Sequence, residues 1–475
     1  MSGVISTELD ADGVLVATID MPGKTMNVFS VELMDALDEL MDRVDRDPAV
    51  KSCVVTSGKS TFLAGADLTM VRGYCDAART LTHDEMFAMC GRLGRQFVRL
   101  EESAKPWVAA VNGLALGGGL ELTLACRERY LADDAALQIG VPEVRWGLLP
   151  GAGGTQRLPR LAPFEPAMEM LLTGRSIDPA AALKLGVATA VVPAAQVLDA
   201  AKSAARALHG IAYDPVKKFG RLAQGEVPAH GKAEARAIAL RHGVSSDDYA
   251  HYPAYGAIVD SVLLGAHLTL ADATAVEMEQ FLRLMFDPVA GRMVRTLFLE
   301  RLRAERELAP TSGIERVRVG PVSAARGAWT QALARLKLAQ EADPTLQADT
   351  LELIDQQGAA HRLALCVLDD MAGSSDATVP RAVLAPAGPY GRVIEIVGAV
   401  DASAVALAAK LRALPWRTPG PASVLQALRG QPLEEQERIA RAALPGAGDP
   451  AFIDVAACLS GVSPAWSGGP LSWRS

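Results

Sequence analysis

The amino-acid sequence predicts an α/β protein, and three observations along its 475 residues point to that fold class. Over the first two hundred residues, short runs rich in β-branched residues alternate with helical patterns, an order typical of βα layering around a largely parallel sheet. A mostly helical region follows, from 201 to 308. Beyond it strand-like and helix-like pieces return, so we expect a second, smaller α/β region.

Five runs justify the alternation in the first part. VLVATID, SCVVTSG and PWVAAVNGLAL have the composition of buried strands, whereas VELMDALDELMDRV and MFAMCGRLGRQFVRLEES place apolar residues at helical spacing. In the helical region this spacing continues through 273–309 and is broken at Pro288. The sequence ELAPTSG at 307–313 has turn composition, which predicts a domain boundary there.

Beyond that boundary the pattern is again mixed. IERVRVGPVSAARGAWTQAL is expected to form a strand, a loop and a helix, and GRVIEIVG and SAVALAAKLRAL a further strand and helix. The tail from about 440 is rich in Gly, Pro, Ser and Trp.

Composition narrows the function classes. The chain carries 47 Lys and Arg against 55 Asp and Glu, without a dense basic cluster, so we expect neither a nucleic-acid partner nor a polybasic membrane surface. The six cysteines lack CxxC spacing, which favours reduced thiols and a cytoplasmic protein. The seven histidines lack ligand spacing, so no metal is expected. We also expect no signal peptide and no membrane span.

One carboxylate stands out in the run ALGGGLELTLAC. Glu121 lies in this apolar run directly after three glycines, although removing a charge from water costs several kcal/mol. An acid in an apolar helix is usually a partly exposed, paired residue. A second acid, Glu143, follows in the loop-like segment VPEVRWGLLPGAGGTQRLPRL, so two carboxylates from separate elements can converge on one substrate.

Two small-residue loops accompany these acids. TFLAGADL at 61–68 and the three glycines before Glu121 can both point backbone N–H groups into a cleft, since glycine allows the close approach of a ligand carbonyl. Two such N–H groups would form an oxyanion hole. Asp67 in the first loop also suits an Asx-type turn.

The segments FLAGADL, KPWVAAVNGLALGGGLELTLAC and VPEVRWGLLPGAGGTQRLPRL resemble, in order, the three signature segments of the enoyl-CoA hydratase/isomerase (crotonase) family. The resemblance covers 1–200 and implies the ClpP-like β-β-α superhelix of that family. It implies that the N–H groups of Ala64 and Gly118 form the oxyanion hole, with Gly65, Ala66 and Asp67 also at the acyl-CoA site.

The family's catalytic glutamates correspond to Glu121 and Glu143. The resemblance implies that Glu121 activates water and Glu143 handles the α-proton of a 2-enoyl-CoA in fatty acid β-oxidation. Retention of both acids favours hydration; a double-bond isomerase, another lyase and a non-catalytic acyl-CoA-binding scaffold are the alternatives.

The order of the regions is similar to the alpha subunits of multifunctional fatty-acid oxidation complexes, in which a 3-hydroxyacyl-CoA dehydrogenase follows the crotonase domain. A G-x-G-x-x-G turn would hold the NAD pyrophosphate, but the matching positions here are Gly320, Val322 and Ala325. The family's catalytic His position, counted back from Glu395, holds Val383. We therefore predict no NAD cofactor and no dehydrogenase activity, although a bifunctional enzyme remains an alternative.

The predicted organisation has four parts: a crotonase-type domain over 1–200, a helical linker region over 201–308, a degenerate Rossmann-like region over 309–430, and a remnant C-terminal segment over 431–475. An unrelated α/β appendage over 310–475 is the competing interpretation. Coenzyme A enters only as part of the substrate. A homo-oligomer or a thiolase partner is compatible with the resemblance.

Overall fold

The computed structural model describes residues 3–220, 230–310, 313–369, 379–386, 390–398, 402–418, 422–447 and 449–474. The chain divides into two compact units, Met1–Gly291 and Arg292–Ser475. The helices between 201 and 291 therefore belong to the first unit.

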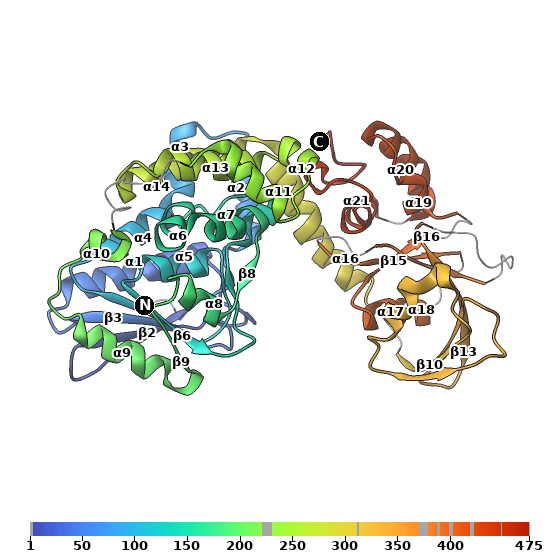
Figure 1. Ribbon diagram of the computed structural model, residues 1–475, viewed down its shortest axis with the longest axis horizontal. Coiled ribbons are helices and arrows are strands. Elements are labelled where there is room, and N and C mark those ends of the chain that lie inside the picture. Colours follow the sequence, from blue (N-terminus) through green and yellow to red (C-terminus); the bar gives the residue numbers. More distant parts are fainter. Residues whose placement is uncertain are drawn as a thin grey trace. The chain divides into compact units, whose positions relative to one another are not determined.

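A six-stranded sheet forms the base of the first unit (Figure 1). Its strands, in spatial order, are β1 (Ile5–Leu9), β2 (Val14–Ile19), β3 (Ser52–Ser57), β4 (Trp107–Val111), β6 (Glu128–Asp133) and β9 (Ala190–Pro193). Only the β1–β2 pair is antiparallel, so the predicted largely parallel sheet is confirmed. Strands β3 and β4 are buried along their whole length, as expected of central strands covered on both faces.

A second, small sheet and a set of helices complete the layered fold. The small sheet contains β5 (Ala115–Leu116), β7 (Ile139–Gly140) and β8 (Ser176–Ile177). The helices up to residue 207 are α1 (Val31–Arg46), α2 (Leu68–Ala77), α3 (His83–Cys90), α4 (Arg92–Glu102), α5 (Gly118–Ala125), η1 (Pro142–Trp146), α6 (Gly154–Leu161), α7 (Phe164–Thr173), α8 (Pro179–Lys184), η2 (Ala194–Gln196) and α9 (Val197–Ala207). The five sequence runs thus form the predicted strands and helices.

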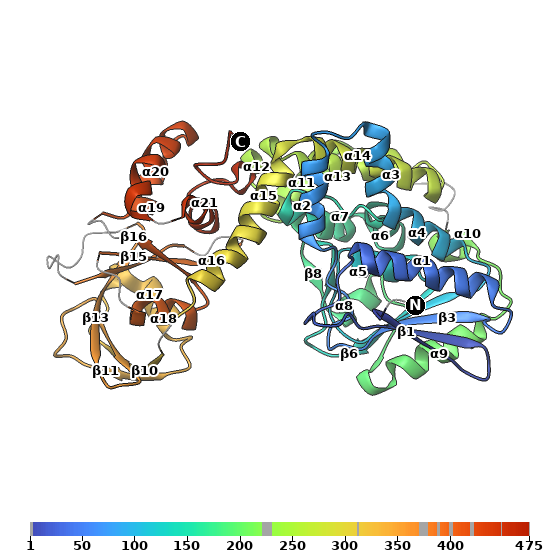
Figure 2. The ribbon, with the colours of Figure 1, turned by 180° about the vertical axis from the view of Figure 1, so that it is seen from behind.

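Helices of the predicted linker region pack onto this layer. They are α10 (Pro215–Phe219), α11 (Lys232–Arg241), α12 (Ser246–His251), α13 (Pro253–Gly265), α14 (Leu270–Phe286) and α15 (Pro288–Met293). The predicted break at Pro288 is confirmed, since α14 ends at Phe286 and Pro288 begins α15. Helices α13 and α14 pack against each other and against α6, which brings the linker region to the acid-bearing segments (Figure 2).

The second unit is built on a seven-stranded mixed sheet. Its spatial order is β11 (Ala339–Ala342), β10 (Ile314–Val319), β12 (Thr350–Asp355), β13 (Ala360–Val367), β14 (Arg381–Leu384), β15 (Val393–Val397) and β16 (Leu414–Thr418). Its helices are η4 (Val294–Glu300), α16 (Arg301–Glu307), η5 (Ala324–Arg326), α17 (Gly327–Leu333), α18 (Ala402–Lys410), α19 (Val424–Leu428), α20 (Leu433–Ala447), α21 (Pro450–Leu459) and η6 (Ala465–Ser467). Residues of α17 and α18 share one core with the sheet.

The predicted second α/β region is confirmed, with a strand pattern that departs from a doubly wound dinucleotide-binding sheet. Pairs β10–β12, β12–β13 and β14–β15 are antiparallel, whereas a doubly wound sheet is mostly parallel. For β12 and β13 the physical reason is local, because they are joined by a tight turn at Gly358, whose φ is +84°, in place of a crossover helix.

No helix in the described ranges combines the length and the apolar character needed to cross a bilayer.

Candidate active site

Glu121 is buried on α5, where it is held by the backbone of a later turn. Its residue is 3% exposed, and its Oε1 accepts the N–H groups of Ala152 and Gly154, both at 2.8 Å. Burial raises the pKa of Glu121 to about 7, while these two N–H donors favour the charged form. Glu121 is therefore a carboxylate stabilised by backbone dipoles and ready to accept a proton near neutral pH.

The turn that holds Glu121 is glycine-rich for steric reasons. Gly153 has φ of +99°, a conformation that favours glycine. A Cβ at Gly154 would lie 2.8 Å from Oε1 of Glu121. The sequence GAGGT thus lets the backbone approach the carboxylate and begin α6 there.

Glu143 lies on the short helix η1 in a contrasting environment. Its Oε2 is buried without a hydrogen-bond partner in the described part of the chain. Burial and the charge of Glu121 raise the pKa of Glu143 well above its ordinary value. Both effects favour the neutral form of Glu143. Its turn is held by the Tyr252 hydroxyl, which donates to the Val144 carbonyl.

The two small-residue loops lie side by side and meet the acids. The Leu116 N–H donates to the Leu63 carbonyl at 3.0 Å, and an isolated bridge pairs Leu63 with Ala115. Gly117, with φ of +51°, lies so close to Glu143 that a Cβ there would collide with Oε1. The structure thus brings the two predicted acids and the two predicted loops into one place.

One predicted oxyanion donor needs correction. The N–H of Ala64 donates to the Asn27 carbonyl at 2.9 Å, so this donor is already used within the fold. The neighbouring predicted residue Ala66 pairs with Phe29 in an isolated parallel bridge, and its own N–H has no acceptor among the described residues. Ala66 therefore replaces Ala64 as the available donor in this loop.

Three other predicted residues of the acyl-CoA site lie in these loops. The N–H of Gly118, the first residue of α5, also has no acceptor among the described residues. Asp67 is the N-cap of α2, and its carboxylate accepts the Thr69 N–H at 2.9 Å, so it forms the expected Asx-type turn. Gly65, with φ of +86°, packs against Leu116.

A further buried acid near this site was not predicted from the sequence. Glu277 of α14 is 0% exposed and accepts the N–H groups of Gly153 and Thr155. The signal available in the sequence was the segment AVEMEQFL, in which Glu277 falls on the apolar side of the helical pattern.

A buried ionic cluster supports the same helices. Arg157 of α6 donates through Nε to Glu101 at 2.9 Å, and both residues are almost fully buried. Lys218 donates to Glu101 at 2.5 Å and to the carbonyls of Leu124 and Ala125 at the end of α5. Burial lowers the pKa of Lys218 to about 8. The helix carrying Glu121 is thus capped at its carboxyl end by a cation.

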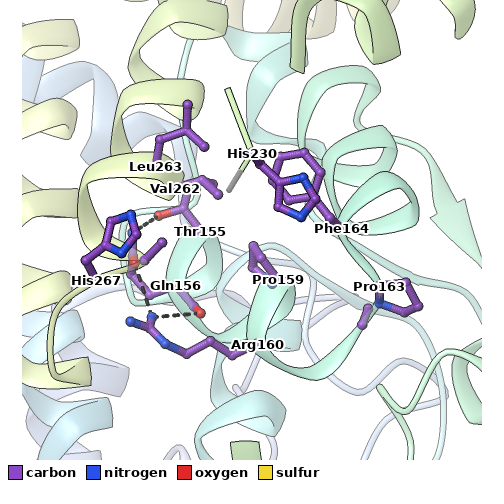
Figure 3. A pocket seen from close by; sticks show the side chains of 12 residues that line it. Thr155, Gln156, Pro159, Arg160, Pro163, Phe164, His230, Val262, Leu263 and His267 are labelled. Atoms are coloured by element: carbon purple, nitrogen blue, oxygen red, sulfur yellow. Dashed lines mark hydrogen bonds between the residues drawn. The ribbon is translucent and has the colours of Figure 1, made fainter. Parts of the chain in front are cut away.

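A separate cavity of about 210 Å³ is lined in part by residues of α6 (Figure 3). Pro159 and Phe164 line it, and the Phe164 ring stacks on His230 with ring centroids 3.7 Å apart. Neither Glu121 nor Glu143 lines this cavity. Thr155 lines the cavity, and its hydroxyl also contacts the buried acid Glu277.

In the second unit, Glu395 is a buried structural acid. It is 0% exposed and accepts hydrogen bonds from the hydroxyls of Thr418 and Ser423 and from two N–H groups at the start of α19. Val383 lies directly opposite Glu395 on the neighbouring strand. The side chain at the predicted catalytic-base position therefore faces the acid without any group that can carry a proton.

The loop after β10 is closed around its own residues. A Cβ at Gly320 would lie 2.6 Å from the Gln347 carbonyl, and Val322 packs against the core. Asp349 accepts the N–H and the hydroxyl of Ser323 at 2.7 and 2.8 Å, just before η5. The side chain of Ala325 lies outside the described part. An anion at this loop would meet the Asp349 carboxylate.

Comparisons with known proteins agree with the geometry. Residues 10–238 match the enoyl-CoA hydratase/isomerase family. A relative from Shewanella sp. (strain MR-4), named fatty acid oxidation complex subunit alpha, is 36% identical over 299 residues, which are 62% of this chain and 41% of that protein. The relative of the same name from Shewanella frigidimarina (strain NCIMB 400) is 34% identical over 316 residues, 64% of this chain and 42% of that protein.

The chain thus spans about two-fifths of the length of these relatives. Among solved structures, an enoyl-CoA hydratase from Geobacillus kaustophilus HTA426 is similar at 25% identity and a TM-score of 0.40, covering 63% of this chain and 95% of that one.

Proposed function

We propose that this chain, whose residues 10–238 match the enoyl-CoA hydratase/isomerase family, adds water across the 2,3 double bond of a trans-2-enoyl-CoA to give a 3-hydroxyacyl-CoA. One observation carries the proposal: two acids in opposite environments, the buried Glu121 and the half-buried Glu143 with its buried Oε2, lie beside two loops with unused N–H groups. Glu121 has backbone donors that favour its charged form, and Glu143 has none on Oε2.

The N–H groups of Ala66 and Gly118 bind the thioester oxygen. Their donation polarises the carbonyl, which makes the β-carbon electrophilic and stabilises the negative charge that develops on oxygen. Because glycine at 117 lets the loop pass against Glu143, the bound thioester lies within reach of that acid.

The two acids then act on different reactants, Glu121 on water and Glu143 on the α-carbon. Glu121 accepts a proton from water while the water oxygen bonds to the β-carbon, and Glu143 gives its proton to the α-carbon. Glu121 ends protonated and Glu143 ends ionised, so exchange of protons with solvent restores the starting state. Pairs of carboxyls whose environments separate their pKa values are typical of such divided acid and base roles.

Incubation of the purified chain with crotonyl-CoA tests the proposal. We expect a product heavier by one water, with loss of the enoyl absorbance in proportion to enzyme. In a parallel incubation with a 3-enoyl-CoA, conversion to the 2-enoyl-CoA without hydration would instead identify an isomerase. If both substrates stay unchanged at stoichiometric enzyme, the chain is a binding protein.

The second unit, in this proposal, holds no NAD and has no dehydrogenase activity. Asp349 at the loop after β10 disfavours a pyrophosphate, and Val383 cannot accept the hydroxyl proton. Glu395 supports this interpretation, since its oxygens are used in holding α19.

A cytoplasmic location and association with a thiolase or with further copies of this chain are also proposed. The location is supported by the six buried cysteines, which form no disulfide within the described residues. The association is supported only by likeness to the alpha subunits, of which this chain spans about two-fifths.

A further inference from the structure

Glu277 is a fully buried acid that the proposed reaction leaves without a role. It lies on α14, beyond the family match at 10–238, and is 0% exposed. A buried carboxylate is costly unless it is well bonded, so its contacts indicate its purpose.

The contacts of Glu277 alternate with those of Glu121 along one turn. Four successive N–H groups belong to residues 152–155. The first and third donate to Oε1 of Glu121, both at 2.8 Å. The second donates to Oε1 of Glu277 at 2.5 Å and the fourth to Oε2 of Glu277 at 2.9 Å. One turn is therefore held between two carboxylates.

A polar network fixes the far side of Glu277. The Thr155 hydroxyl lies 2.5 Å from Oε2 of Glu277 and 2.6 Å from the Ser261 hydroxyl. Gln156 donates through Nε2 to both hydroxyls, at 3.0 Å each. All these groups are buried, so the carboxyl position of Glu277 is determined by several bonds at once.

The charged groups around Glu277 come from several elements. Glu121 of α5 and Glu143 of η1 are its acidic neighbours, and Arg157 and Arg160 of α6 are its basic ones. The next acid along α14 is Glu279, whose Oε2 lies 2.9 Å from Nε2 of His83 on α3. Burial, then the charge of Glu121, raises the pKa of Glu277 to about 8.

We propose that Glu277 is a positioning residue for Glu121: by accepting the N–H groups of Gly153 and Thr155, it fixes the turn that presents the N–H groups of Ala152 and Gly154 to the catalytic carboxylate. The proposal rests on the hydratase function proposed above. It assigns to α14 a part in the active site, and catalysis by residues 1–200 alone would be impaired.

The variant Glu277→Gln tests this role, with Glu279→Gln as its control on the same helix. Gln cannot accept both N–H groups with its two terminal atoms, so the turn loosens. We expect kcat on crotonyl-CoA to fall by about tenfold or more, as a small misplacement of a catalytic group does, while KM changes by less than about threefold. Glu279→Gln should keep the kcat of the wild type.

The pH profile separates positioning from other roles. A loosened turn weakens the two bonds that favour charged Glu121, so the acid limb of kcat should move to higher pH by about half a unit or more. A shift to lower pH would show that Glu277 acts only through its negative charge, and an unmoved limb would show a purely structural role; either result overturns the proposal.

A second variant keeps the test decisive if Glu277→Gln fails to fold. Thr155→Val removes the hydroxyl bond while the Glu277 side chain and the backbone N–H of residue 155 remain, so the acid limb should move in the same direction by a smaller amount. A wild-type profile in Thr155→Val would contradict the proposal. An inactive wild type would refute the hydratase function itself, whereas an active wild type with a normal Glu277→Gln variant would refute the positioning role alone.

Discussion

Gly117 and Glu143 lie so close together that a single methyl group on the glycine would collide with Oε1 of the acid. The glycine also adopts φ of +51° and ψ of −125°, which an L side chain rarely adopts. This contact joins the loop that precedes α5 to the turn that carries Glu143, the proposed proton donor.

Gly117→Ala should therefore displace Glu143 and reduce hydratase turnover by about a hundredfold or more, the scale of general acid contributions. The far-ultraviolet circular dichroism spectrum should remain that of the wild type. Gly73→Ala is the matched control, since a Cβ there meets nothing within 4 Å. Equal turnover in the two variants would contradict the role of this contact.

Gly118→Val should damage the oxyanion hole. A Cβ at residue 118 would lie 2.9 Å from the Phe29 ring, so the start of α5 must shift and its N–H moves away from the thioester oxygen. The expected cost in kcat/KM is about 3 kcal/mol of barrier, typical for the loss of one such donor. Full activity would mean that the thioester carbonyl binds elsewhere.

The pH dependence of activity follows from Glu121. Burial raises its pKa to about 7, and only the carboxylate accepts a proton from water, so kcat should fall as pH decreases through about 7. Steady-state rates on crotonyl-CoA, measured from about pH 5 to about pH 9, would give this acid limb of the pH profile. A rate that stays constant down to pH 5 would be inconsistent with Glu121 as the base.

The free energy of unfolding should decrease as pH rises because of Glu143, whereas the activity should increase. Its folded-state pKa is raised, so the folded state binds the proton more tightly than the unfolded state, and stability decreases as pH rises above the unfolded value. Glu143→Gln removes this effect, and its Tm at pH 8 should equal or exceed that of the wild type. A Tm lower by several degrees would show that the acid stabilises the fold.

The second unit should neither bind NAD nor oxidise a 3-hydroxyacyl-CoA. Titration with NAD by calorimetry should give no heat of binding, and incubation with 3-hydroxybutyryl-CoA plus NAD should give no NADH, because Val383 cannot accept a proton. Micromolar binding, or NADH formed in proportion to enzyme, would establish a bifunctional enzyme.

Local sequence patterns were enough to predict the two glutamates, but they did not predict features that depend on contacts between distant parts of the chain. Glu121 and Glu143 were predictable because each lies in a motif with its own loop. The donor Ala64 was wrong because the direction of its N–H depends on pairing with the chain at Asn27. Glu277 was missed because its partners, Gly153 and Thr155, are more than a hundred residues away.

The second unit gives a similar lesson. The strand at 314–319 and the helix after it follow from apolar spacing, which is a local property. The antiparallel pairing of β10 with β12 depends on contacts between separate strands, which spacing does not encode.

The most direct test of the account compares turnover of crotonyl-CoA by the wild type, Glu121→Gln and Glu143→Gln, with folding checked by circular dichroism. Each substitution removes one proton-transfer group and keeps its shape, so we expect kcat to fall by about a hundredfold or more in both variants. Wild-type turnover in either folded variant would contradict the assignment of base and acid to these two glutamates.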